Sequence, residues 1–483
     1  MSYLGIDLGT SGLRALLVDE DGAPIGSAER HYQPLHPHSG WSEQNPDDWI
    51  AALEGAVGEL CEKFPRFKDL KGIGVAGHMH GATLLDKEGS VLRPCILWND
   101  TRSHVEAGLL DQTNEMRALS GNIVFPGFTA PKLVWVKKHE PDTFKAVDKV
   151  LLPAAFLNYY LTGDFVADMS DSTGTSWLDT GGRDWSDRLL EIGDMRRDQM
   201  PRLVEGSACA GQLRTALVKK WGLDNSVMVA GGAGDNAAAA CGIGALNKGQ
   251  GFVSLGTSGV LLAAREGYAP APETAVHTFC HAIPERWYQM GVMLSATDSL
   301  NWLSQVTGSS PAALTQSLGR DIQAPGKVRF LPYLSGERTP HNDADIRGCF
   351  AGISIDTSRD DLTRAVLEGV AFGLRDSFEA LKSTGANFDR LIAIGGGTGS
   401  RYWLEVIATV LDIALQLPKG GEFGAALGAA RLGIAATSGA RPETFMSEPE
   451  MGETIEPACE MTAQFDADYQ AFRDSYLKVK SIS

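Results

Sequence analysis

The amino-acid sequence predicts an α/β protein built from two related domains that face each other across a cleft. The chain has 483 residues, which exceeds the roughly 300 residues that one hydrophobic core usually organises. In addition, the segment Leu8–Gly12 recurs letter for letter as Leu255–Gly259, half a chain later. Each copy lies between two apolar segments of strand type, so both are predicted to be β-hairpins with a glycine-rich turn. We interpret this repeat as two related domains, each of which begins with a hairpin.

The boundary between the domains is placed just ahead of the second hairpin. Residues 1–245 then form the N-terminal domain and residues 246–483 the C-terminal domain. The segment Asn45-Pro46-Asp47-Asp48 predicts a helix start in the first domain. It combines a capping asparagine, a proline at the first helical position and acidic residues in the first turn.

Four glycine-rich turns follow predicted strands and are candidates for phosphate binding. Two are the hairpin turns. The other two, Gly231–Gly234 and Gly395–Gly399, join an apolar strand to helical sequence, which covers residues 402–415 after the second turn. Exposed N–H groups in such turns can cradle an anion, and only glycine permits so close an approach. No P-loop pattern is present. The candidate nucleotide contacts are Gly9, Thr10, Ser11, Gly256, Thr257, Ser258, Gly395, Gly396, Gly397 and Ser400.

Composition and charge exclude several classes of protein. The net charge of −17 argues against non-specific binding to nucleic acid or to an anionic membrane. No uncharged apolar run reaches the roughly 18 residues of a membrane helix, and the first residues do not resemble a signal peptide. The seven cysteines are scattered without a C-x-x-C motif, which favours reduced thiols. We therefore expect a cytoplasmic protein.

Two acidic residues accompany the glycine-rich turns. Asp7 ends the first strand and either forms the turn or holds Mg²⁺-bound water facing nucleotide phosphates. Asp235 stands where a helix begins, with Asn236 beside it as a candidate substrate contact. It either caps the helix or accepts a proton from a substrate hydroxyl, and we expect its carboxylate to be ionised without a raised pKa.

Two polar clusters follow strands and are candidates for a sugar site. The loop Gly77–Gly81 carries Met79 and His80, and the segment from Leu97 to Arg102 carries Trp98 and Asn99. Hydrogen-bonding side chains beside an aromatic wall are typical of polyol and sugar sites. His80 is expected to donate a hydrogen bond to a sugar hydroxyl. The sequence does not favour a metal role for His78 and His80, because no further ligand lies within metal-motif spacing.

Longer motifs connect the chain with a known family. Residues 127–135, and residues 348–353 with their continuation to Glu368, resemble the two signatures of the FGGY carbohydrate kinases, members of the actin-like ATPase superfamily. The resemblance covers essentially the whole chain. Residues 41–44, 79–83 and 333–341 are most similar to the branch of this family that acts on D-xylulose, although His78 stands where glutamine is usual in that branch.

The resemblance implies two actin-like (ribonuclease H-like) ATPase domains and the ATP-dependent phosphorylation of D-xylulose at its 5-hydroxyl, as in xylose catabolism. It implies that the N-terminal domain binds the sugar and that the C-terminal domain binds the nucleotide. Asp235 would be the catalytic base, Asp7 would lie at the Mg²⁺·ATP phosphates, and Met79 and His80 would contact the sugar.

Three interpretations of the function remain open. The favoured one is a sugar kinase, for D-xylulose or for another ketopentose or polyol such as ribulose. The second is a non-metabolic actin-like ATPase, which would have no use for the two polar clusters. The third is a dinucleotide oxidoreductase, suggested only by the turn Gly395–Gly399. The expected partners are a small-molecule sugar and ATP, without nucleic acid or membrane, and a homodimer is left open.

Overall fold

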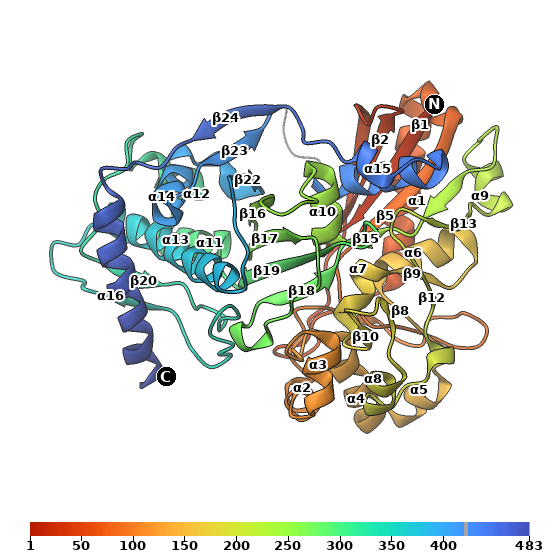
Figure 1. The fold of residues 1–483 in the computed structure, drawn as a ribbon, viewed down its shortest axis with the longest axis horizontal. Coiled ribbons are helices and arrows are strands. Elements are labelled where there is room, and N and C mark those ends of the chain that lie inside the picture. The colour runs from red at the N-terminus through yellow and green to blue at the C-terminus, as the bar shows by residue number, and fades with distance from the viewer. Residues whose placement is uncertain (420–423, 483) are drawn as a thin grey trace.

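A computed structural model describes residues 1–419 and 424–482. Two lobes lie side by side, and each is built around a mixed β-sheet covered by helices (Figure 1). The first sheet has the strand order β13-β14-β5-β1-β2-β3, with β15 paired to β5. Its strands are β1 (Ser2–Leu8), β2 (Gly12–Asp19), β3 (Pro24–His31), β5 (Leu70–Gly77), β13 (Cys209–Gln212), β14 (Met228–Ala230) and β15 (Ala233–Gly234).

The second sheet repeats the arrangement of the first. Its strand order is β18-β19-β17-β16-β22-β23-β24. The strands are β16 (Gly251–Leu255), β17 (Gly259–Arg265), β18 (His277–Cys280), β19 (Trp287–Met293), β22 (Leu391–Ile394), β23 (Leu415–Pro418) and β24 (Met451–Ile455). In both sheets an antiparallel hairpin, β1–β2 or β16–β17, pairs on one side with an antiparallel strand and on the other with a parallel one. The two predicted hairpins and the α/β fold with two related domains are confirmed.

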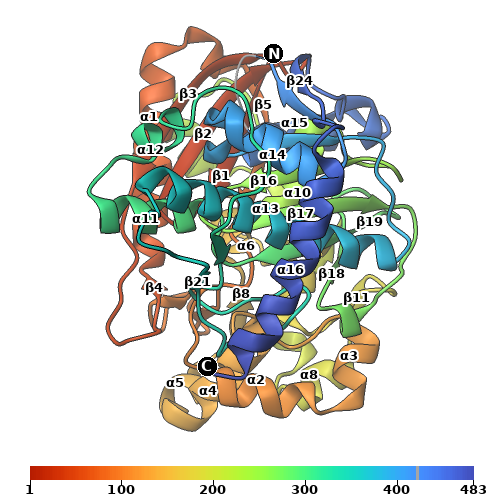
Figure 2. The same ribbon diagram turned by 90° about the vertical axis from the view of Figure 1, so that its left-hand side faces the viewer.

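Helices cover both sheets. They are α1 (Pro46–Lys63), α2 (His104–Asp111), α3 (Asn114–Ser120), α4 (Thr129–His139), α5 (Pro141–Ala146), α6 (Pro153–Thr162), α7 (Met169–Ser172), α8 (Asp187–Ile192), α9 (Thr215–Lys220), α10 (Asp235–Ile243), α11 (Thr297–Thr307), α12 (Pro311–Gln316), α13 (Arg359–Ser383), α14 (Arg401–Leu411), α15 (Gly424–Ser438) and α16 (Thr462–Lys480). The long helix α16 crosses the outer face of the second lobe (Figure 2). Short strands form two-stranded ladders outside the main sheets: β4 (Glu43–Gln44) with β7 (Cys95–Ile96), β6 (Thr83–Leu85) with β8 (Lys149–Leu151), β9 (Val166–Asp168) with β12 (Arg202–Val204), β10 (Leu178–Asp179) with β11 (Asp184–Trp185), and β20 (Arg329–Leu331) with β21 (Cys349–Ala351).

Local signals explain where two helices begin and end. The side chain of Asn45 accepts a hydrogen bond from the N–H of Asp47 and caps α1, as predicted. The predicted helix over residues 402–415 is too long at its end. It stops at Leu411, because Asp412 adopts a left-handed conformation with φ of 52° and the chain then enters β23.

Helix α15 joins the two lobes. It belongs to the second half of the sequence, yet it packs on β1 and β5 of the first sheet (Figure 1). Glycines make this packing close, because a Cβ atom at Gly5 or Gly74 would stand 1.9 Å from the carbonyl oxygen of Ala426 or Ala429. The alanine-rich helix α10 packs on the other side of α15, and their buried residues form one core with those of β16 and β22. The two small-residue helices therefore form one part of the interface between the lobes.

All seven cysteines are free thiols, as expected. Among the described residues, no helix is both long enough and apolar enough to cross a membrane.

Candidate functional site

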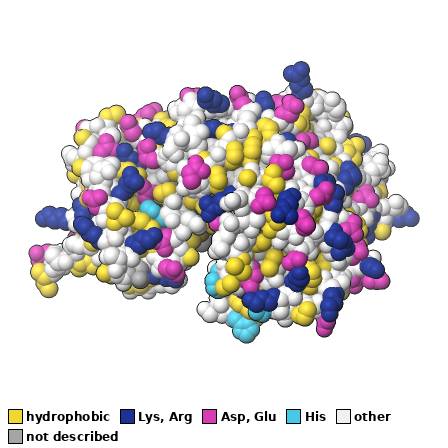
Figure 3. All heavy atoms as spheres, turned by 60° about the horizontal axis from the view of Figure 1, so that its bottom comes forward, with side chains coloured by type: hydrophobic (Ala, Val, Ile, Leu, Met, Phe, Trp, Pro, Cys, Tyr) yellow, Lys and Arg dark blue, Asp and Glu magenta, His cyan; other side chains and the backbone are white. Residues whose placement is uncertain are grey.

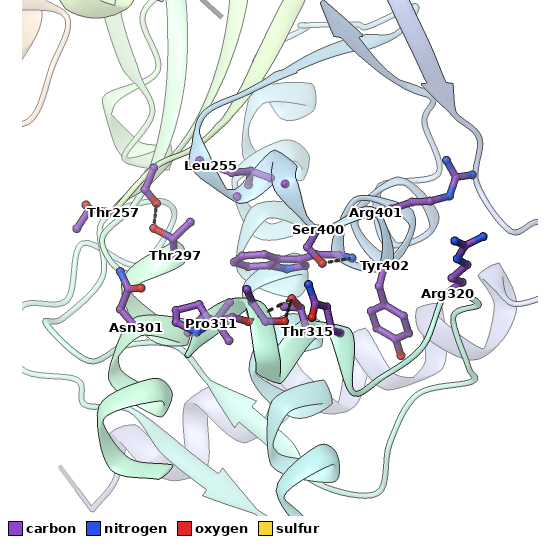
Figure 4. A pocket seen from close by; sticks show the side chains of 18 of the residues that line it. Leu255, Thr257, Thr297, Asn301, Pro311, Thr315, Arg320, Ser400, Arg401 and Tyr402 are labelled. Carbon is purple, nitrogen blue, oxygen red and sulfur yellow. Dashed lines mark hydrogen bonds between the residues drawn. The ribbon is translucent and has the colours of Figure 1, made fainter. Parts of the chain in front are cut away.

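The larger of two cavities near the second hairpin lies within the second lobe and has a volume of about 1020 Å³ (Figure 4). Helices α11, α12 and α14 and the second hairpin turn surround it. Its walls are Leu255, Gly256, Thr257, Thr297, Leu300, Asn301, Pro311, Ala312, Thr315, Gln316, Gly319, Arg320, Gly396, Gly397, Gly399, Ser400, Arg401, Tyr402 and Trp403. A lining that combines glycine turns, amide side chains and apolar side chains suits a nucleotide.

The second hairpin turn is fixed by the start of α11. The carbonyl oxygen of Gly256 accepts hydrogen bonds from the N–H and the hydroxyl of Thr297, at 3.0 and 2.7 Å. The carbonyl oxygen of Thr257 accepts the N–H of Ala296 at 2.9 Å. Since its carbonyl groups are paired with α11, the turn is held in place before any ligand arrives.

The last glycine-rich turn forms a short 3₁₀ helix, Gly396–Gly399, ahead of α14. Gly395 requires its glycine, because φ is 92° and a Cβ atom would stand 2.8 Å from the carbonyl oxygen of Leu255. Ser400 caps α14 by accepting a hydrogen bond from the N–H of Trp403 at 3.3 Å. Gly396, Gly397 and Ser400 line the larger cavity, and Gly395 fixes the turn behind them. Their role as nucleotide contacts stays a prediction.

The smaller cavity has a volume of about 190 Å³ and lies between the two lobes. Its walls come from both halves of the chain: Met79, His80, Trp98, Asp235, Asn236, Ser254, Gly256, Ser258, Val260, Met290, Val292 and Arg338. Five residues of the first half that were singled out in the sequence therefore meet at one cavity. Gly256 lines both cavities, so the second hairpin turn is where they adjoin.

Asp235 is the acidic residue in the wall of the smaller cavity. It is the first residue of α10, after the N-cap residue Gly234. Its Oδ1 atom accepts hydrogen bonds from the backbone N–H of Asn236 at 2.7 Å and from the Asn236 side chain at 2.9 Å. Burial raises the pKa of the carboxyl to about 6, although these hydrogen bonds oppose the shift. The expectation of an ordinary pKa is therefore wrong, because the sequence does not reveal how deeply the carboxyl is buried.

His80 presents an acceptor to the cavity rather than the expected donor. Its Nδ1 atom lies 2.8 Å from the carbonyl oxygen of Gly174, which can only accept, so Nδ1 carries the proton. Burial lowers the pKa of the ring to about 3, and it is neutral with a lone pair on Nε2. The ring stacks on Phe128 at 4.4 Å, and φ of 71° holds the backbone in the left-handed region. Lys132 stabilises this conformation by donating to the His80 carbonyl oxygen at 2.8 Å.

His78 points away from the cavity. Its ring is buried and lies edge-on to Trp49 at 5.6 Å, and burial lowers its pKa to about 3. No group of three potential metal ligands occurs in the part of the chain that the structure describes.

The first hairpin turn and Asp7 lie outside the walls of both cavities. The turn is anchored by Tyr32, whose hydroxyl donates to the Gly9 carbonyl oxygen at 2.7 Å. The Thr10 hydroxyl accepts a hydrogen bond from Trp98 Nε1 at 3.0 Å, which links this turn to the smaller cavity. Asp7 is the penultimate residue of β1, opposite Arg14 on β2 and Ala76 on β5. Ser11 is exposed, as is Asn99, the one substrate-contact candidate that the structure does not bring to the cavity.

Sequence reasoning missed several wall residues. Met290, Val292 and Arg338 reach the smaller cavity from the second half of the chain. The helix α12 and the pair Asn301 and Arg320 complete the larger one. Arg338 had a usable signal, because it lies in the segment 333–341 that carries part of the family resemblance. The others belong to ordinary helix and strand sequence, except Arg320, which follows α12 in a loop.

Comparisons with known proteins agree with this geometry. The chain is 45% identical over 480 residues to the xylulose kinase of Escherichia coli K12, which covers 99% of this chain and 98% of that protein. A solved structure of a kinase from Brucella ovis, described as a xyloylose kinase, shares 54% identity with a TM-score of 0.97 over the full length of both chains. The xylulose kinase of Rhodospirillum rubrum shares 27% identity with a TM-score of 0.90, covering 100% of this chain and 99% of that one.

Both halves of the sequence match one family. Residues 2–242 match the N-terminal domain of the FGGY carbohydrate kinases and residues 251–437 match the C-terminal domain. The chain belongs to the FGGY family of carbohydrate kinases, whose actin-like two-domain fold it shares.

Proposed function

We propose that the protein transfers the γ-phosphoryl group of ATP to the 5-hydroxyl of D-xylulose, as an enzyme of xylose catabolism. Membership of a carbohydrate kinase family excludes a dinucleotide oxidoreductase and a non-metabolic ATPase. The near full-length relatives named as xylulose kinases favour D-xylulose over ribulose and other polyols. The observation that carries the proposal is Gly256, which lines both the larger cavity and the one that holds Asp235.

In this proposal Asp235 is the catalytic base. Its carboxylate is ionised at neutral pH, since its pKa is about 6. As the bond between the sugar oxygen and phosphorus forms, Asp235 removes the proton of the 5-hydroxyl. Asn236 orients the carboxylate through its two hydrogen bonds. Met79, His80 and Trp98 bind the rest of the sugar, with Asn99 at the rim.

ATP occupies the larger cavity in this proposal. The adenosine lies against Gly395–Gly397 and Ser400, and the phosphates extend toward Gly256, Thr257 and Ser258. The first hairpin turn, with Gly9, Thr10 and Ser11, contacts the terminal phosphate when the lobes close. Closure would exclude water, which otherwise competes for the phosphoryl group.

Mg²⁺ fits the residues at the end of β1. This ion keeps several waters and binds through one or two carboxylates together with substrate phosphates, and does not need a protein cage. Asp7 supplies one carboxylate at the end of the strand that leads into the first turn. When bound, Mg²⁺ neutralises the charge that develops on the phosphates. We propose that the Asp7 carboxylate binds the water molecules coordinated to Mg²⁺.

We further propose the domain boundary near residue 245, with the nucleotide in the second domain and the catalytic base in the first. A cytoplasmic location without nucleic-acid or membrane partners is part of the proposal. It is supported by the net charge of −17 and by the interspersed acidic and basic side chains on the face in Figure 3. A homodimer is left open.

The test is ATP consumption with a panel of sugars. The protein should consume ATP strongly with D-xylulose, weakly with D-ribulose and polyols, and only at background rate with glycerol or without sugar. Equal ATP consumption with and without every sugar would contradict the proposed reaction. A clear preference for another ketose would keep the reaction and change the substrate.

A further inference from the structure

Arg338 is a half-buried cation that faces the smaller cavity from the second lobe. Burial lowers the pKa of its guanidinium to about 10, so it stays charged at neutral pH. The guanidinium carbon lies 5.1 Å from the ring centroid of Phe125. Arg338 lines the smaller cavity, and in the described part of the chain no carboxylate forms an ion pair with it. Its five N–H donors are therefore available to acceptors on a ligand that enters the cavity.

The loop around Arg338 is fixed on both sides. Glu337 Oε1 accepts the backbone N–H of Leu294 at 3.0 Å and that of Arg338 at 2.8 Å. Thr339 donates its N–H to Val292, accepts the N–H of Val292 and donates its hydroxyl to Ala275, at 3.0, 3.0 and 2.9 Å. Since the residues before and after Arg338 are hydrogen-bonded to β19 and to Leu294, which follows it, the backbone at Arg338 is held in place.

Arg338 lies at the His80 end of the cavity. Its guanidinium lies over the ring of Phe125, the Phe125 ring contacts that of Phe128 at 5.6 Å, and Phe128 stacks on His80 at 4.4 Å. The positive charge of Arg338 accordingly adds to the effect of burial in lowering the pKa of His80. The donor fork and the His80 ring are therefore connected through one aromatic cluster, in the wall of the cavity that also holds Asp235.

We propose that Arg338 and His80 together recognise the hydroxyketone end of the sugar, an inference that rests on the proposed sugar kinase activity. A ketone oxygen only accepts hydrogen bonds and matches the guanidinium, which only donates. The neighbouring hydroxyl can donate to the lone pair on His80 Nε2. Reduction of the ketone to an alcohol replaces the strong acceptor by a group that also carries a proton, so the pair distinguishes a ketose from the corresponding pentitol.

The experiment compares D-xylulose with xylitol and D-arabinitol, the two pentitols formed by reducing its C2 carbonyl. The variants are Arg338→Met, which removes the donors, and Arg338→Lys, which keeps the charge without the fork. Arg347→Met is the matched control, because Arg347 is exposed and donates hydrogen bonds to the carbonyl oxygens of Ala344 and Ile346 in the same loop. Thermal melting and binding of a non-hydrolysable ATP analogue confirm that each variant is folded.

Arg338→Met should lower kcat/KM for D-xylulose about 10- to 100-fold, mainly through KM, because a charged hydrogen bond is lost. For the pentitols, kcat/KM, or the competitive inhibition constant where turnover is too slow, should change less than about threefold. Arg338→Lys should show the same pattern with a smaller loss and carries the test if the methionine variant does not fold.

Equal losses for ketose and pentitol would overturn the proposal and indicate a contact with the transferred phosphoryl group. Unchanged ketose kinetics in a folded variant would also overturn it. If wild-type protein uses a different ketose, the proposed substrate is wrong, but the same comparison with that ketose and its pentitols still tests Arg338.

Discussion

Leu8–Gly12 and Leu255–Gly259 are the same five residues and both form the turn of an antiparallel hairpin, but Leu8 pairs with Leu13 whereas Leu255 pairs with Gly259, so the second loop is one residue shorter. Of the two cavities described above, both are lined by the second copy and neither by the first. The second turn is bound to the start of α11 and stands where the two cavities adjoin. The first turn is bound to Tyr32 and Trp98 and faces neither cavity directly. Local sequence thus determines the hairpin, whereas the surrounding elements determine its role.

The residue before each repeat differs in charge. Asp7 precedes the first copy and Ser254 precedes the second. Ser254 lines the smaller cavity, where a second carboxylate beside Asp235 would repel phosphate. In our account the second turn is preassembled for ligands, and the first turn brings Asp7 to the phosphates when the lobes close.

The largest expected effect comes from Asp235→Asn, which removes the base beside the second turn. Turnover should fall about 10²- to 10⁴-fold, while both substrates still bind. The variant should melt at a higher temperature at pH 7. The folded-state pKa of about 6 exceeds the ordinary value, so ionisation destabilises the fold as pH rises through this range, and asparagine removes that cost.

Asp187→Asn is the matched control for this variant. Asp187 is likewise the first residue of a helix, α8, but it is exposed and pairs with Arg197. It should retain normal turnover. Near-normal turnover of a stable Asp235→Asn protein would end the proposed mechanism.

The next largest effect concerns Asp7, the charge specific to the first turn. Asp7→Ala should reduce turnover about 10²-fold or more and raise the Mg²⁺ concentration needed for half-maximal rate. Sugar affinity should hardly change. Calorimetric titration with sugar is decisive, because a folded variant that has lost sugar affinity contradicts the assignment.

The pH dependence of kcat/KM tests the catalytic role of Asp235 separately from the roles of the two hairpin turns. Only the ionised Asp235 accepts a proton, and burial raises its pKa to about 6. The rate should therefore be flat above neutrality and fall about tenfold per pH unit well below pH 6. A profile that stays flat to pH 5 would place the titrating base elsewhere.

A matched pair of glycine substitutions compares the two turns directly. At Gly256 a Cβ atom meets only the Ser258 carbonyl oxygen at 3.5 Å, and at Gly9 it meets the Gly12 carbonyl oxygen at 3.2 Å. Both alanine variants should fold, although the added methyl group has less space at Gly9 than at Gly256. Gly256→Ala should weaken binding of an ATP analogue without sugar about tenfold, because the methyl group enters the cavity.

Gly9→Ala should leave this binary affinity within about twofold and lower kcat about tenfold instead. Isothermal titration and steady-state kinetics measure the two quantities. If both variants weaken binding of the ATP analogue equally, the two turns do not differ in the way proposed, with the second preassembled for ligands and the first acting when the lobes close.

The smallest expected effect is a change of shape. Binding of sugar together with a non-hydrolysable nucleotide should bring the first turn toward the second and compact the protein in small-angle scattering. Nucleotide alone should compact it less. A profile that saturating ligands leave unchanged would rule out closure as the way the first turn reaches the phosphates.

The sequence was sufficient to predict the fold class and much of the site. The repeated hairpin identified the two related sheets, because identical turns in strand contexts are rare by chance. Five residues of the smaller cavity were found because each lies in a loop or turn that follows a strand, or directly after such a turn. They are Met79, His80, Trp98, Asp235 and Asn236. Residues at the ends of neighbouring strands lie at the same edge of a sheet, so their proximity can be predicted without knowing how the helices pack.

The remaining features depend on packing between distant segments. The tautomer of His80 is set by Gly174, 94 residues away, and the pKa of Asp235 by its burial. Arg338 reaches the smaller cavity from the second half of the chain. Helix α15 lies on the first sheet although the predicted boundary assigns it to the second domain. Apart from Arg338, which lies in the segment 333–341 of the family resemblance, none of these features leaves a periodic or local pattern in the sequence.

The central claim is that ATP and the sugar hydroxyl meet at the second turn, and analysis of the products tests it most directly. D-xylulose and ATP are incubated with the protein, and ADP and sugar phosphate are quantified while phosphorus NMR locates the phosphate. Our account predicts one sugar phosphate per ADP, with the phosphate on the 5-oxygen. Phosphate on another oxygen, or ADP formed without sugar phosphate, would contradict it.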